Sequence, residues 1–211
     1  MQQFYDGSNT IICGPSSSGK TTLLKRIIDN SNVLYETKPQ RVIFIFKHWQ
    51  PLYQVIESEN NNVTFINHIP EESELLDMVK GSSHSMLICD DMLSELNANS
   101  FALQLFTRLS HHFNISTIIM QQSNTMANKF NSSINKNSHY TILMRSSRDG
   151  NTLRSMGGQL NDYKKLLAAY KDATSQKPFS YILIDSHPKS NPKICYKTSI
   201  FPDDEVCIAY V

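Results

Sequence analysis

Short apolar runs of strand length alternate with amphipathic stretches along most of this chain. Strands are predicted at 10–13, 41–46, 63–66, 86–90, 115–120 and 139–144. Several of these runs are apolar throughout, as is typical of parallel strands that are covered on both faces. Helices are predicted at 19–30, 71–80, about 98–113, and 160–171. This alternation indicates an α/β fold in which helices flank a mostly parallel central sheet.

The pattern changes after about residue 175. Residues 180–185 and 193–200 have the composition of two strands, and the turn-rich segment 186–192 separates them. Such an arrangement is typical of two strands that pair with each other. We therefore expect a C-terminal β-hairpin at the edge of the sheet.

The 211 residues suit one domain with a substantial core. No internal repeat or low-complexity linker divides the sequence, so we expect a single domain over 1–211, with its core at about 8–175 and the hairpin at about 176–205. Hydrophobic residues make up 40% and charged residues 18%, which excludes a disordered chain. The formal net charge of +1 excludes a polycation, so nucleic-acid binding would need a local patch or a ring of subunits.

The sequence indicates an intracellular protein without a membrane span. No apolar run approaches the ~20 residues that a membrane helix needs, and residues 1–6 lack the features of a signal peptide. The four cysteines have no C-x-x-C spacing, and Cys13 and Cys89 lie inside predicted strands, which favours reduced thiols. The seven histidines form no ligand cluster, since the adjacent His111 and His112 would point to different sides of a helix.

A distinctive loop joins the first predicted strand to the first predicted helix. It matches G-x-x-x-x-G-K-[ST], and its residues are Gly14, Pro15, Ser16, Ser17, Ser18, Gly19, Lys20 and Thr21. A phosphate-binding P-loop needs this context, because the loop N–H groups and the helix dipole converge on phosphate. We expect Lys20 to reach the terminal phosphates, Thr21 to ligate Mg²⁺, and Thr22 to extend the nucleotide-binding segment. The alternative is a surface loop before an ordinary helix.

The strand at 86–90 ends in two carboxylates, in the position of a Walker B motif. Asp90 is expected to hold Mg²⁺, directly or through water, and Asp91 to polarise the attacking water. A strand end is rigid and lies beside the P-loop at the carboxyl edge of a parallel sheet. The alternative is that the two acids begin a turn, or that Asp91 caps a helix.

The strand at 115–120 is followed by Gln121 and Gln122. In P-loop motors with an extra strand between the P-loop strand and the Walker B strand, a polar residue here senses the γ-phosphate. Gln121 is the first choice for this sensor and Gln122 the second, because an amide can bond both phosphate and water. The alternative is that both are ordinary polar residues at a strand end.

Arginines supply further candidate chemistry. Arg108 lies on the helix predicted before this strand. An arginine from a neighbouring subunit stabilises the charge that develops in phosphoryl transfer, so Arg108 is a candidate trans arginine. A surface ion pair is the alternative. A second basic group, formed by Arg145, Arg148 and Arg154, could supply the trans arginine instead, contact DNA phosphates or form a solvated loop.

These motifs resemble the FtsK–HerA superfamily of DNA-pumping ATPases. More narrowly, the chain is similar to the genome-packaging ATPases of poxvirus-like large DNA viruses and of Maverick/Polinton and adintovirus-type elements. The passages that carry the resemblance are 14–21, 87–91, 106–116, 137–140 with Arg148-Asp149, and 181–188. Many ATPases share the P-loop. The helix with Arg108, His111 and His112, and the late passage Asp185-Ser186-His187-Pro188, are more selective.

The resemblance implies an ASCE/RecA-like P-loop NTPase that uses ATP and Mg²⁺ to thread double-stranded DNA into a preformed capsid. It also implies a homo-oligomeric ring, a viral capsid or portal-vertex protein as partner, and no membrane. The expected location is the nucleus or cytoplasm of an infected host cell, or the virion. The chain departs from the family in its serine-rich P-loop and in having two glutamines where relatives often have Gln-Asn. We expect any N-terminal capsid-attachment module to be missing or supplied elsewhere.

Three other functions compete with a packaging motor. A GTPase is disfavoured, because Asn135-Lys136-Asn137-Ser138 lacks the aspartate of N-K-x-D. A small P-loop nucleotide or nucleoside kinase is the main alternative, although it has little use for paired acids beside a polar sensor strand. A scaffold that binds ATP without turnover is the third. The candidate DNA contacts are Lys47-His48-Trp49 and Lys164-Lys165.

Overall fold

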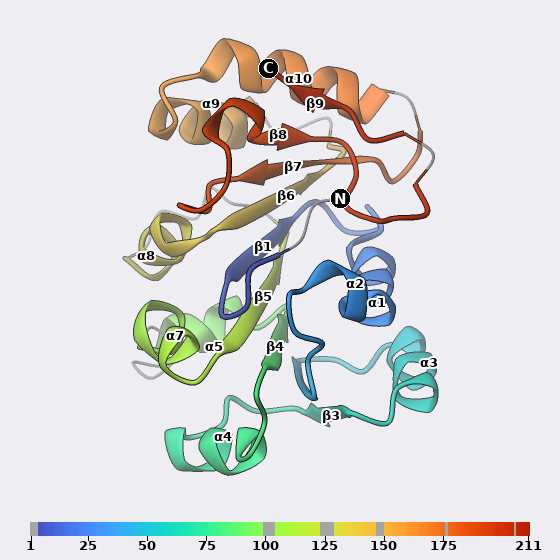
Figure 1. Cartoon of the computed structure of the whole chain (residues 1–211), viewed down its shortest axis with the longest axis vertical. Helices are drawn as coiled ribbons and strands as arrows, with labels where there is room; N and C mark the ends of the chain where they lie inside the picture. The colour runs from blue at the N-terminus through green and yellow to red at the C-terminus, as the bar shows by residue number, and fades with distance from the viewer. Residues whose placement is uncertain (1–3, 99–103, 123–128, 147–149, 176, 205) are drawn as a thin grey trace.

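The computed structural model describes residues 4–98, 104–122, 129–146, 150–175, 177–204 and 206–211. In these segments nine strands form one sheet in the order β3-β2-β4-β5-β1-β6-β7-β8-β9 (Figure 1). The parallel strands, in that order, are β3 (Val63–Ile66), β2 (Arg41–Phe46), β4 (Ser85–Asp90), β5 (Ile115–Gln121), β1 (Asn9–Cys13) and β6 (Tyr140–Met144). The sheet continues antiparallel with β7 (Tyr181–Asp185), β8 (Tyr196–Lys197) and β9 (Ala209–Tyr210).

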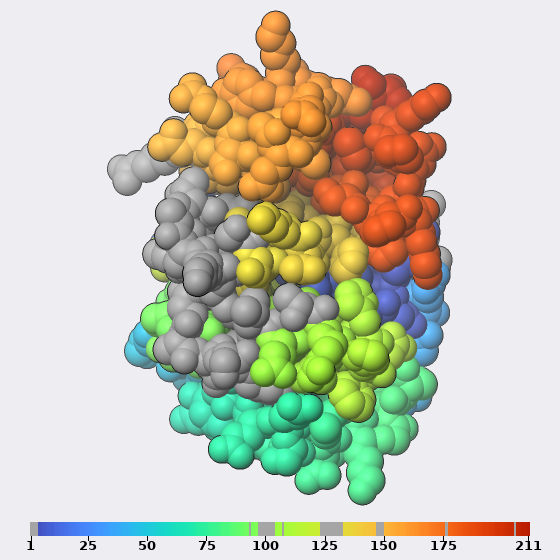
Figure 2. Space-filling model, turned by 90° about the vertical axis from the view of Figure 1, so that its left-hand side faces the viewer, coloured from blue at the N-terminus to red at the C-terminus, as the bar shows by residue number. Residues whose placement is uncertain are grey.

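Helices cover both faces of this sheet, which confirms the predicted α/β class. One face carries α1 (Lys20–Asp29), α2 (Ser31–Leu34) and α3 (Pro51–Glu59). The other carries α4 (Glu72–Val79), α5 (Leu93–Ala98), the π-helical turn η1 (Leu105–Leu109) with α7 (Ser110–His112), α8 (Lys129–Asn137), α9 (Gly150–Gln159) and α10 (Tyr163–Ser175). Figure 2 looks onto this second layer, from α10 at the top to α4 at the bottom. None of the described helices has both the length and the apolar character that a bilayer crossing requires.

The strand pleat separates two hydrophobic cores. Residues such as Ile12, Ile88 and Met120 point to the α1–α3 layer, and their neighbours Cys13, Cys89 and Ile119 point to the opposite layer. Burial on both faces explains why these strands are apolar throughout. The alternation along each strand also determines to which face of the sheet a polar residue at the end of that strand points.

The C-terminal hairpin is present, but its second strand is shorter than predicted. Residues 192–194 form a 3-10 turn (η2, Pro192–Ile194), because Pro192 fits the first position of a turn and the Asn191 side-chain oxygen accepts the Lys193 N–H at 3.0 Å. Strand β8 therefore pairs with β7 over two residues only. The short strand β9 then pairs with β8 and was not predicted.

Several helices were not predicted. Helix α3 begins with Pro51, a residue favoured at a helix start, and α9 contains Gly157 and Gly158, which weaken a helical pattern. The predicted start at 160 is wrong, because Asn161 adopts φ +52° and separates α9 from α10. Of the helix predicted at about 98–113, residues 99–103 lie outside the described residues.

Candidate nucleotide site

Strand β5 holds the loop between β1 and α1 at the carboxyl edge of the sheet. The Gly14 amide donates to the Gln121 carbonyl at 3.1 Å. A β-carbon on Gly14 would lie 2.6 Å from Met144 Cβ and 2.7 Å from Ser18 Oγ, so only glycine fits there. Gly19 takes the left-handed conformation, at φ +93°, and begins α1 with no side-chain cap. The first amides of α1 are thus available to an anion.

Lys20 lies over this loop. Its ammonium donates to the carbonyls of Gly14, at 2.7 Å, and Pro15, at 3.0 Å. Burial lowers the pKa of Lys20, while the negative charges of Asp90 and Asp91 oppose that shift. The loop therefore combines uncapped amides with a half-buried cation that is electrostatically coupled to both acids of the Walker B strand.

A single amide side chain bridges Thr21 and Asp90. Gln50, the residue before α3, accepts a weak hydrogen bond from the Thr21 hydroxyl at 3.5 Å. Its amide nitrogen donates to Asp90 Oδ2 at 3.4 Å. Hydroxyl and carboxylate oxygens are ligands that Mg²⁺ accepts in proteins. The two oxygen donors expected to bind Mg²⁺ thus reach the same small space from different elements.

Asp90 is a buried carboxylate with a second partner from α3. The Tyr53 hydroxyl donates to Asp90 Oδ2, and Asp90 is only 6% exposed. Burial raises the pKa of Asp90, and Asp91 adds to that shift; the Tyr53 hydrogen bond and Lys20 oppose it. Burial and the bond to Asp90 likewise raise the pKa of Tyr53. The carboxylate is therefore kept at an energetic cost that a bound cation would relieve.

Gln50 and Tyr53 were missed in the sequence analysis. Strand β2 pairs with β4, and Phe46 lies in register with Asp90, so the segment after β2 must run beside the Walker B strand. Sequence spacing alone does not show that pairing. The sequence offers one signal for this segment, which is the tryptophan Trp49 shortly after the strand at 41–46. We interpreted Trp49 as a candidate DNA contact rather than as part of the site.

Replacing Asp90 by asparagine should stabilise the metal-free protein. At pH 7 we expect the variant to be more stable by roughly 0.5–2 kcal/mol, because the neutral amide removes a desolvated charge. The folded-state pKa is raised, so wild type gains stability as the pH falls toward the unfolded value, and the difference between the two proteins should shrink in acid. Thermal melting in EDTA at several pH values measures this.

Asp91→Asn is the matched control for this prediction, because Asp91 is exposed and its replacement should change the melting temperature little. A D90N variant that melts below wild type at pH 7 would show that the carboxylate stabilises the fold.

The other predicted catalytic residues surround the same edge. Asp91 directly follows β4, is exposed, and adopts φ +56°, a conformation that aspartate tolerates. Gln121 is 2% exposed. It lies in register with Cys13, so its side chain points to the same face of the sheet as Cys13, which is opposite to the face of Asp90. Gln122 is exposed in the bend directly after β5. Gln121, the first choice from sequence, thus points to the face opposite Asp90, and both glutamines remain sensor candidates.

The described candidate arginines are all exposed, and Arg145 lies at the same carboxyl edge of the sheet as the P-loop. Arg108 is exposed on η1, and its guanidinium donates to the Gln104 side chain at 3.4 Å within the same helix. Arg145 is exposed at the carboxyl end of β6, and Arg154 is exposed on α9. Arg148 lies outside the described residues. Each described arginine has the exposure that a contact with another subunit needs.

The candidate DNA contacts differ in how free their charges are. Lys47 forms an ion pair with Glu95 at 2.8 Å. Trp49 is 47% exposed and lies edge-on to the rings of Phe46, Tyr53 and Phe65, so it is half core and half surface. Lys164 is exposed on α10, whereas the Lys165 ammonium lies 5.6 Å from the centre of the Tyr196 ring.

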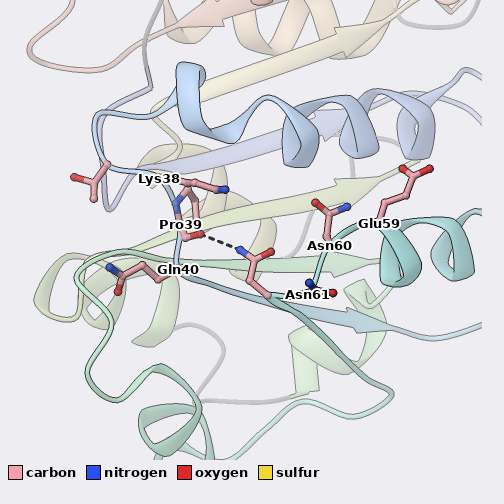
Figure 3. A pocket seen from close by; sticks show the side chains of 8 residues that line it. Lys38, Pro39, Gln40, Glu59, Asn60 and Asn61 are labelled. Atoms are coloured by element: carbon pink, nitrogen blue, oxygen red, sulfur yellow. Dashed lines mark hydrogen bonds between the residues drawn. The ribbon is translucent and has the colours of Figure 1, made fainter.

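Two features occupy the amino edge of the sheet, away from the P-loop. An open hollow of about 680 Å³ lies between residues 37–40 and 59–62, where Asn62 Nδ2 donates to the Pro39 carbonyl at 3.0 Å (Figure 3).

The second feature is a group of three histidines. The centroid of the His139 ring lies 5.5 Å from that of the His111 ring and 4.8 Å from that of the His187 ring. Burial and the neighbouring histidines lower the pKa of His139 to about 4. Among the described residues, no group of three or more His, Cys, Asp or Glu side chains is arranged to hold a metal ion.

Comparisons with known proteins identify the fold. No protein-family model and no curated protein matches the chain. The genome-packaging NTPase B204 of Sulfolobus turreted icosahedral virus 2, in complex with ATP-γS, superposes with a TM-score of 0.59 at 14% identity, over 85% of this chain and 93% of that one. B204 of Sulfolobus turreted icosahedral virus, a DNA-packaging ATPase, gives 0.58 at 15% identity, over 86% and 93%. The chain thus has the fold of a P-loop NTPase.

Proposed function

We propose that this protein is an ATP hydrolase of the FtsK–HerA type that drives double-stranded viral DNA into a capsid. The observation that carries the proposal is the meeting of Thr21 and Asp90 at Gln50, beside the P-loop and Lys20. The likeness to B204, named as a genome-packaging NTPase and solved with ATP-γS and with AMPPCP, supports both the nucleotide and the packaging role. The whole chain acts as one domain in this proposal.

The residues divide the work of hydrolysis among them. The loop amides and Lys20 bind the phosphate chain, and Thr21 and Asp90 hold Mg²⁺, which supplies charge neutralisation at the terminal phosphates. Asp91 accepts the proton of the attacking water, and Gln121 or Gln122 orients that water. An arginine of a neighbouring subunit, Arg108 or one of the group Arg145, Arg148 and Arg154, completes the site.

A trans arginine makes the homo-oligomeric ring part of the proposal, since a lone subunit would lack one catalytic group. The other proposed partners are double-stranded DNA and a capsid or portal-vertex protein. The proposed location is accordingly the infected host cell or the virion. DNA contacts would be made mainly to phosphates, because a translocating motor must pass over every sequence.

We expect double-stranded DNA to stimulate ATP hydrolysis, and this stimulation to weaken steeply between about 50 and 200 mM salt. Phosphate contacts release counterions, so DNA affinity falls on the order of 10³-fold over this range when six or more contacts are made. Steady-state phosphate release, read beside particle size with Mg²⁺ and ATP, measures both effects. Monomeric protein that ignores DNA and phosphorylates added nucleosides would be a kinase instead. Nucleotide binding without turnover would indicate a scaffold.

A further inference from the structure

Phe179 has a position that the packing of the core does not explain. It lies two residues before β7, its side chain is 64% exposed, and its backbone adopts φ +61°. That left-handed conformation favours glycine and asparagine, and a bulky residue rarely adopts it. Because the ring is mostly exposed, it contributes little hydrophobic free energy to the stability of the fold. A strained, exposed aromatic residue therefore calls for a role on the surface.

The ring of Phe179 lies against the P-loop. A β-carbon on Gly19 would be 3.1 Å from Phe179 Cδ1 and 3.2 Å from its Cβ. Strand pairing explains this contact, because β7 runs antiparallel to β6 and Tyr181 lies opposite Met144, the last residue of β6. The residues before β7 thus reach the same carboxyl edge as the P-loop. The Arg145 N–H fixes them there by donating to the Ser180 carbonyl at 2.9 Å.

Phe179 lies on the opposite side of the P-loop from Asp90. In the sheet, β4 with Asp90 is two strands from β1 on one side, and β7 is two strands away on the other. Terminal phosphates held near Asp90 leave the nucleoside end to extend toward β7. Two strand spacings are about 10 Å, a distance that the phosphate chain and ribose can cover.

A hollow opens beside Phe179, between Arg26 of α1, the end of α10 and the segment that follows β8. It has a volume of about 490 Å³, and Phe179 and Arg26 are among the residues that line it. Arg26 is one turn after Thr22 on the same side of α1. Its guanidinium is fixed by Asp203 at 2.7 Å and Asp204 at 2.8 Å, so this wall is preformed.

We propose that Phe179 is the platform on which the base of the bound nucleoside triphosphate stacks. Stacking on an aromatic ring accepts any base, but a purine offers more area than a pyrimidine, so the site takes a purine nucleotide in preference. This inference rests on the proposed function, because it requires a triphosphate in the P-loop. It adds the recognition of the base, which the loop cannot provide.

The test compares ATP, CTP and inorganic tripolyphosphate as probes in equilibrium binding to the whole chain. We expect Phe179→Ala to weaken ATP binding by about tenfold or more and to reduce the preference for ATP over CTP. Tripolyphosphate has no base, so its affinity should not change. Phe179→Tyr should retain ATP affinity. Phe113→Ala is the matched control, because Phe113 is 39% exposed at the amino edge of the sheet.

Three results would overturn the proposal. Equal ATP affinity in Phe179→Ala and wild type would remove the base platform. An equal loss of tripolyphosphate binding would show that the ring only shapes the P-loop, and altered particle size with intact ATP affinity would make Phe179 a subunit contact. Wild-type protein that binds neither ATP nor tripolyphosphate would contradict the proposed function itself, which separates the two failures.

Discussion

Replacing Lys20 by alanine should reduce ATP turnover by about 10²–10³-fold, the loss typical when one donor to transition-state charge is removed. The ammonium lies within the P-loop, and Asp90 and Asp91 lie near enough to influence its pKa. The loop has no other cationic side chain that could replace Lys20, because its remaining residues are glycine, proline, serine and threonine. Steady-state phosphate release at saturating ATP and Mg²⁺ measures the loss.

Lys25→Ala is the matched control. Lys25 lies on the same helix and pairs with Asp29 and Glu59, both at 2.6 Å, on the surface. Such pairs contribute about 1 kcal/mol or less, so this variant should keep its activity. Equal activity of K20A and K25A would remove the P-loop from the mechanism.

Asp91→Asn should lower kcat by about 10²–10⁴-fold, the range for loss of a general base, with little change in ATP affinity. Asp91 is exposed at the end of β4, one residue after the buried carboxylate proposed to hold Mg²⁺, so its side chain can meet water. Asparagine keeps the shape of the side chain and tolerates φ +56°, but it cannot accept the proton. Single-turnover hydrolysis and equilibrium ATP binding, measured on the same protein, separate the two effects.

Glu57→Gln controls for the loss of one negative charge, since Glu57 is exposed on α3. If D91N hydrolyses ATP at the wild-type rate, Asp91 is not the base, and the two acids serve the turn after β4. If D91N instead loses ATP binding, Asp91 belongs to the metal site with Asp90.

The parallel core was predictable because each strand carries its own signal. The runs 41–46 and 63–66 have the predicted bounds, since short segments rich in β-branched and aromatic residues leave few alternatives at strand length. Helix α3 was missed because its signal depends on Pro51 as a start and on burial against β2, which no local pattern reveals. The length of β8 likewise depended on a turn held by the Asn191 side chain.

The two halves of the candidate site differ in the same way. Gly14, Gly19 and Lys20 belong to one continuous motif, so their joint position follows from local sequence. Gln50 and Tyr53 reach Asp90 only because β2 and β4 are neighbours in the sheet. The order of strands depends on packing between distant segments, so residues brought in by it are visible only in the folded chain. The face to which Gln121 points likewise depends on its register with Cys13 in the folded sheet.

The aromatic cluster beside Asp90 also gives the protein an intrinsic optical reporter. The chain has one tryptophan, and the centroid of the Trp49 ring lies 5.7 Å from that of Tyr53, whose hydroxyl is bonded to Asp90. Indole emission depends on the polarity and the quenching groups around the ring. A cation that draws Asp90 away from Tyr53 therefore changes the surroundings of the sole indole, and its fluorescence follows site occupancy without an added dye.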